Sequence, residues 1–310
     1  MSKNKTLKNI GPDKIISQLK AKIYRLNNIP PAIALYLRPI LAKEKILDQP
    51  MIVIPPNTVA TINFNQKENK IWGAATIISG SGSQLTLIQR QNQTGAAASL
   101  IVANPGAKID YAVITKTEQE TIIKKVAVVQ AQAIMTWYPV ALATKNYSAL
   151  IKSEVIGQGS QCKIIGLLKA AGQSQSTISL EHRHFGKQTV GDIFFRAIGN
   201  DQAQATVNGL IKIELKAKQT NSYLTENALL LTDQCSIKAD PHLEILNNDV
   251  KASHSATVAT LDEQAMAYLA SRGLKPKEAE QLLVEAFYQA VINKITVPAI
   301  TTAVKHVYEN

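Results

Sequence analysis

Cysteine, aromatic residues and long hydrophobic segments are all scarce in this chain of 310 residues. Its two cysteines, Cys162 and Cys235, are too few for a disulfide framework, which fits a reducing cytosol. No apolar run reaches the roughly 20 residues that a membrane-spanning helix needs. The N-terminus contains lysines but lacks the apolar stretch of an export signal. These absences predict a cytoplasmic protein that does not enter a membrane.

Motifs that bind phosphate groups or preformed metal centres are also missing. The chain contains neither Gly-x-x-x-x-Gly-Lys-Ser/Thr nor Gly-x-Gly-x-x-Gly. It has no Cys-x-x-Cys pair of the kind that holds zinc or a cluster, and no Gly-x-Ser-x-Gly nucleophile elbow. Acids such as Asp233 and Asp249 fall in turns, whereas solenoid lyases and hydrolases cluster theirs on one strand face. We therefore expect a non-catalytic protein, with a β-solenoid enzyme acting on a polymeric substrate as an alternative.

The net charge of +11 raises the question of a nucleic-acid partner. Residues 1–28 carry seven Lys or Arg residues against the single acid Asp13, a local excess of +6. Tyr24 is the only aromatic residue among them, whereas a surface that stacks bases needs several. We interpret this region as a solvated basic arm and helix face. A basic structural or nucleic-acid-binding protein remains an alternative.

The period of the sequence becomes that of β-strands from about Met51. Short β-branched segments bounded by Gly, Pro, Asn or Ser follow one another, with a less regular stretch near Thr117–Gln132. No helical pattern separates the strands, which argues against βαβ units. Small residues recur after polar turns at intervals of 14, 18 and 17 residues, at Ala203, Ala217, Cys235 and Ala252. This repeat favours a β-solenoid, and a β-sandwich remains the structural alternative.

Helical patterns stand at both ends of the strand-rich region. Gly11-Pro12-Asp13 opens an amphipathic N-terminal helix that extends to Leu26. Near the C-terminus, Thr260 and Glu263 have the spacing of a capping box, and Gly273 suits a helix end. A second helix restarts at Lys275-Pro276, and a third follows Pro298. We divide the chain into a basic arm with a helical segment (1–48), a β-helix core (49–260) and a C-terminal helical module (261–310).

Histidines are the candidate sites of chemistry. His254 lies at the change from strands to helices, beside small residues that allow another surface to approach. A neutral imidazole there can ligate iron or carry a proton, although a structural role is the simpler interpretation. His182 and His184 fall on one face of a strand and could form a ligand pair, but hydrogen bonding at a strand surface is the favoured interpretation.

Around His254, several segments follow one another in a specific order and spacing: Asn227–Thr232, Pro241–Ile245, Asn248–Thr257 and Tyr268–Gly273, then Glu278-Ala279 and Phe287. This combination resembles the SufB/SufD family of the Suf iron–sulfur cluster assembly complex. The similarity covers residues 180–295 well and residues 95–180 more loosely. Within the family, the sequence looks more like the SufD type.

The resemblance implies a right-handed parallel β-helix with flanking helices. It implies a scaffold subunit that pairs with SufB, or with a second copy of itself, and that binds the ATPase SufC through its C-terminal helices. His254 would then be a ligand at the interface where a nascent cluster is transiently held. Cys235 is a second candidate ligand, with an inward core position as the alternative. The residues expected to contact the ATPase or the end of the β-helix are Tyr268, Arg272, Leu282, Leu283 and Phe287.

Overall fold

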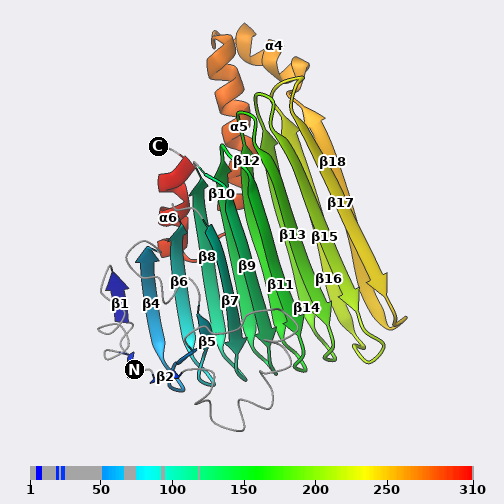
Figure 1. The fold of residues 1–310 in the computed structure, drawn as a ribbon. Coiled ribbons are helices and arrows are strands. Elements are labelled where there is room, and N and C mark those ends of the chain that lie inside the picture. The colour runs from blue at the N-terminus through cyan, green and yellow to red at the C-terminus, as the bar shows by residue number, and fades with distance from the viewer. Residues whose placement is uncertain are drawn as a thin grey trace.

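Parallel strands stack into two facing nine-stranded sheets, A and B, in the computed structural model (Figure 1). The structure describes residues 5–8, 19–20, 22–24, 51–65, 75–91, 95–117 and 119–308. From β3 onward the chain alternates between the sheets, so one strand of each sheet and two turns make one rung of a solenoid. The pairing of β2 with β3 is antiparallel, and the remaining described pairings are parallel.

The sheets are ordered along the axis of the solenoid. Sheet A contains β1 (Lys5–Lys8), β4 (Val59–Asn65), β6 (Gln84–Gln91), β8 (Lys108–Thr117), β10 (Ile134–Ala143), β12 (Gln161–Ala170), β14 (Val190–Gly199), β16 (Thr220–Leu230) and β18 (Val250–Thr260). Sheet B contains β2 (Lys22–Tyr24), β3 (Met51–Val53), β5 (Thr76–Ile78), β7 (Gly95–Ala103), β9 (Thr121–Val129), β11 (Tyr147–Val155), β13 (Gln175–His184), β15 (Gln204–Ile213) and β17 (Ser236–Ile245).

These sheets confirm the predicted mainly-β solenoid and exclude the sandwich, whose sheets would be antiparallel. Two local predictions are wrong. The stretch expected to be irregular contains β9, a full strand of sheet B. The N-terminal helix cannot extend to Leu26, because residues Lys22–Tyr24 form β2. The rest of that helix, and most of the basic arm, lie outside the described residues.

One turn of the rung repeats with a recognisable sequence pattern. A residue in the left-handed conformation, such as Gly82 or Gln132, is followed at once by a small inward residue. Glycine adopts this conformation without strain, and Gln132, Gln188 and Gln219 take its place in other rungs. The small residues that follow are fully buried: Ser83, Ala107, Ala133, Ser160, Thr189 and Thr220. They let the chain turn closely over the rung below.

The two turns together explain the spacing noted in the sequence. Ala203 and Cys235 immediately precede β15 and β17, which are neighbours in sheet B, and Ala217 precedes β16 of sheet A. Intervals of 14 to 18 residues are therefore half-rungs, and two of them return the chain to the same sheet.

Inward side chains of both sheets form one continuous core. Tyr111 and Trp137 stack in neighbouring rungs, with ring centres 5.3 Å apart. The indole Nε1 of Trp137 and the thiol of Cys162 both donate to the hydroxyl of Ser153, each over 3.0 Å. Polar groups thus occur inside the solenoid, and these are satisfied by neighbours across the interior.

Three helices follow the last strand: α4 (Glu263–Ser271), α5 (Pro276–Ile292) and α6 (Pro298–Tyr308). The N-cap of α4 is Asp262, whose carboxylate accepts from the amides of Gln264 and Ala265, so the predicted capping box at Thr260 is wrong. Gly273 ends α4 with a φ of +92°, and Pro276 begins α5, both as predicted. None of the described helices is long and apolar enough to cross a membrane.

The second half of α5 and all of α6 cover the outer face of sheet A (Figure 1). Val291, Ile300 and Val304 form a second apolar cluster with outward residues of β10 and β12, such as Val140 and Leu167. Because α4 has no buried residue, this covering fixes α5 while leaving α4 exposed beyond the ends of the strands.

Candidate interface site at the open end of the solenoid

The solenoid ends at β17 and β18, each of which pairs with only one neighbour among the described strands (Figure 1). Nearly every residue of β18 is exposed, whereas β16 beneath it alternates between buried and partly exposed positions. Unpaired backbone groups along such an edge can form hydrogen bonds to another strand. The final rung therefore leaves one strand edge of each sheet available for pairing with another strand.

His254 occupies the last position of an inward row in sheet A. The strand register places one residue of this row in each rung, and all but the last are buried. From β4 onward the row consists of Ile62, Leu87, Tyr111, Trp137, Ile164, Ile193, Leu224 and His254. Because no described rung lies beyond it, an inward imidazole is exposed at the end of the solenoid. The backbone of His254 is therefore fixed by strand pairing, while its side chain can be reached from solvent.

One ring nitrogen of His254 is already used within the chain. Nδ1 lies 2.9 Å from the carbonyl oxygen of Pro241 on β17. A carbonyl can only accept, so Nδ1 carries the hydrogen, and in the neutral imidazole the lone pair is then on Nε2. Histidines that ligate metals commonly donate their other nitrogen to such an acceptor, which fixes the tautomer and the ring orientation. The contact with Pro241 thus fixes the ring orientation of His254.

Cys235 does not share this location. It is buried at the beginning of β17, stacked on Ala203, and its thiol donates to the carbonyl of Thr232 over 3.1 Å. Six residues of extended chain separate it from Pro241, a distance of roughly 20 Å. The structure therefore places Cys235 as a small inward residue, far from the imidazole of His254.

Glu226 is a candidate that sequence reasoning missed. It faces inward on β16, only 1% exposed, and neither carboxyl oxygen has a hydrogen-bond partner of good geometry. Burial raises the pKa of Glu226 to about 8, while the backbone of Asp240 opposes part of the rise. Its position between the inward residues Leu224 and Ala228 was the available signal, because an acid in such an alternation points into the core.

His182 and His184 are inside the solenoid, which contradicts the predicted role at a strand surface. His184 Nδ1 lies 2.9 Å from the hydroxyl of Thr189, and Nε2 lies 3.2 Å from that of Ser222. Both nitrogens of His182 lack a described partner. Burial lowers the pKa of His184 to about 4 and holds that of His182 well below its usual value. Both imidazoles are therefore neutral core groups at pH 7.

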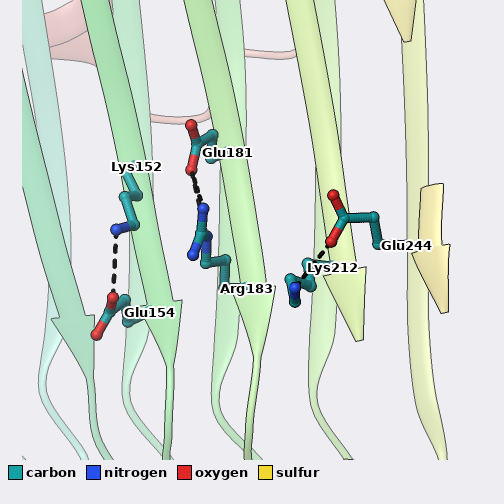
Figure 2. Close-up of polar contacts among 6 residues, drawn as sticks. All are labelled: Lys152, Glu154, Glu181, Arg183, Lys212 and Glu244. Atoms are coloured by element: carbon teal, nitrogen blue, oxygen red, sulfur yellow. Dashed lines mark hydrogen bonds and ion pairs between the residues drawn. The ribbon is translucent and has the colours of Figure 1, made fainter. Parts of the chain in front are cut away.

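Salt bridges lie on the outer face of sheet B, two within a strand and one between β15 and β17 (Figure 2). Lys152 lies 3.3 Å from Glu154, Arg183 lies 3.3 Å from Glu181, and Lys212 lies 2.8 Å from Glu244. The register sets Lys152 beside Glu181 and Glu154 beside Arg183, so signs alternate along and across the strands. A nucleic-acid surface would show a stripe of one sign, which this face does not.

The predicted partner-binding residues of the helices separate into two groups. Tyr268 and Leu282 are 57% and 46% exposed, Arg272 lies over the Tyr268 ring, and Leu283 is half-buried. Phe287 instead packs against the outer face of sheet A. The guanidinium of Arg196 lies 4.4 Å from its ring centre and donates to its carbonyl oxygen. Phe287 thus attaches α5 to the solenoid.

In the part of the chain that the structure describes, no three His, Cys, Asp or Glu side chains gather closely enough to hold a metal ion.

The family model described as "SUF system FeS cluster assembly, SufBD core domain" matches residues 62–287. The chain belongs to this family. The resemblance noted in the sequence is thereby confirmed.

Individual relatives are similar over shorter stretches. The iron–sulfur cluster assembly protein SufD of Bacillus subtilis is 29% identical over 157 residues, which are 51% of this chain and 36% of that protein. SufD of Escherichia coli is 38% identical over 92 residues, 30% of this chain and 22% of its own. A SufBD family protein of Synechocystis is 30% identical over 142 residues, 44% of this chain and 30% of that protein. The chain therefore spans at most 36% of the length of these three SufBD family relatives.

The buried imidazole of His184 predicts a loss of stability in mild acid. Its folded pKa of about 4 lies below the ordinary value of about 6.5, so the unfolded chain binds more protons between these values. The stability that it contributes is complete above pH 6.5 and is lost as the pH falls towards 4. The free energy of unfolding, measured with urea, should fall between pH 7 and pH 5 in the wild type. In His184→Gln this fall should be about 2 kcal/mol smaller.

The control for this measurement is His242→Gln, which changes an exposed imidazole on β17. The free energy of unfolding of this variant should fall between pH 7 and pH 5 by as much as that of the wild type. An equal fall in the free energy of unfolding for the wild type and for His184→Gln would contradict the assignment of His184 as a neutral buried histidine.

Proposed function

We propose that this chain is a SufD-like, non-catalytic scaffold subunit for iron–sulfur cluster assembly. The observation that carries the proposal is the placement of His254. In a SufBD-family chain, an inward row ends in an accessible imidazole whose Nδ1 is held by Pro241. The similarity to proteins named SufD supports the same role. The nascent cluster is cargo in this account, held transiently and passed on.

The partner at the open end is a SufB-like subunit or a second copy of this chain. The edges of β17 and β18 offer unpaired backbone groups to a second set of strands. The inward residues of the last rung, including Ile245 and Val258, are partly uncovered, and a partner rung would bury them. Docking there places His254 between two subunits, where the partner adds the thiolates that this end of the chain lacks.

The ATPase partner, a SufC-like subunit, binds the hairpin of α4 and the first half of α5. This hairpin presents Tyr268 and Leu282 to solvent, and its base is attached to sheet A through Phe287 and Arg196. A movement of the ATPase would therefore be transmitted to the solenoid through α5. No membrane surface enters this account.

Co-purification tests the ATPase assignment. When the chain is expressed with a SufC-like ATPase and a SufB-like subunit, the wild type should retain both. Leu282→Asp places a charge at an exposed apolar position and should reduce ATPase recovery several-fold, while Gln281→Asp, at the neighbouring exposed position, should not. A monomeric wild type with lyase activity on a polysaccharide would support the solenoid enzyme and contradict the scaffold.

The site itself is tested in the assembled complex. His254→Ala removes the exposed nitrogen but no buried packing, so the subunits should still assemble while cluster formation, followed by absorption, falls several-fold. His242→Ala is the matched control, because it removes an exposed imidazole from the outward side of β17. An unchanged cluster yield for His254→Ala would refute the ligand role.

A further inference from the structure

The carboxyl group of Glu226 lies against Gly209, one rung below Pro241, which is in contact with His254. Gly209 on β15 is the register partner of Pro241, and Leu224 on β16 is the register partner of His254. A Cβ placed on Gly209 would collide with Oε1 of Glu226 and with the methyl groups of Leu224. Oε1 therefore takes the space that a side chain on Gly209 would fill, one rung below Pro241, whose carbonyl oxygen bonds the imidazole. Adjacent rungs are separated by about 5 Å.

The surroundings of Glu226 leave it room and an approach from outside. Gly209 is the residue without a side chain in its row, and the carboxyl fills the space that a side chain would take. In the final rung the residue above Glu226 is Ala256, whose exposed side chain is a single methyl group. The carboxyl thus lies one small residue below the open end.

A buried carboxyl whose oxygens lack a hydrogen bond of good geometry is costly to keep in a core. Leaving a polar group unpaired there costs about 1–3 kcal/mol, and more when the group is ionised. An apolar side chain at position 226 would avoid this cost, as Leu224 and Ala228 do on either side. Glu226, whose carboxyl has the backbone of Asp240 beside it, and His254, whose Nε2 is not used in the contact with Pro241, are instead available as ligands near the end of the solenoid.

We propose that Glu226 and His254 form a half-site for a divalent metal ion, which ligands from the docked partner complete. Metal binding releases the proton that burial keeps on Glu226 near pH 7, and the resulting carboxylate oxygen with an imidazole nitrogen suits iron(II), cobalt(II) and zinc(II). The absence of a third ligand from the described part of the chain agrees with a site that is incomplete without the partner. The inference deepens the proposed function and rests on it for the identity of the metal as iron.

Metal binding to the isolated chain tests the half-site without any partner. Cobalt(II) is titrated into the full-length chain and followed by calorimetry and visible absorption. The wild type should bind one ion saturably. Glu226→Gln keeps the shape of the side chain and should weaken binding at least ~10-fold, as should His254→Ala.

Two surface variants serve as matched controls. Glu244→Gln removes a carboxylate and His242→Ala an imidazole from the outward face of β17, and both should bind cobalt(II) like the wild type. Thermal unfolding without metal verifies that Glu226→Gln is folded. Wild-type affinity in Glu226→Gln, or no saturable binding by the wild type, would overturn the half-site.

The two proposals can fail separately. If Glu226→Gln binds cobalt(II) normally and the assembled complex still forms clusters through His254, only the half-site is wrong. If cobalt(II) binding depends on both residues but no ATPase or second subunit associates, the half-site stands and the assembly function is wrong.

Discussion

In-register stacking of rungs is the constraint on which the rest of this structure depends. Each inward residue rests on its counterpart in the rung below, so the interior is a set of rows that run along the axis. Within the solenoid every row is closed on both sides by its neighbours. At β17 and β18 the closure stops, and both the strand edges and the ends of the inward rows are exposed. The open end is therefore a consequence of the architecture, and its chemistry depends on which residues terminate the rows.

The interior contains both paired and unpaired polar groups, and unpaired ones such as His182 occur in the middle rungs as well as near the open end. In the middle rungs, Ser153 accepts hydrogen bonds from Trp137 and Cys162. Such satisfied groups specify the packing and leave nothing for a ligand. In the last two rungs, Glu226 and His254 keep atoms without partners. Unsatisfied groups close to a surface are where a metal ion or a second subunit gains most from binding.

Much of the fold could be predicted from the sequence, and the site only in part. Strand lengths, turn residues and the C-terminal helices are local properties, and the half-rung spacing of Ala203, Ala217 and Cys235 was visible. The inward or outward direction of a given side chain depends on register, which turns of different length shift from rung to rung. For this reason His182 was expected at a surface, and Glu226 was not singled out. The N-cap of α4 at Asp262 was missed because two acceptable capping residues stand two positions apart.

Hydrogen–deuterium exchange tests most directly the claim that the open end is the assembly interface. In the isolated chain, the amides of Val250–Thr260 should exchange faster than those of β14 and β16, which lie between paired strands. When a SufB-like partner binds, β17 and β18 should become protected, while the outer face of sheet B should not change. Protection confined to that outer face, or none at β18, would contradict the account.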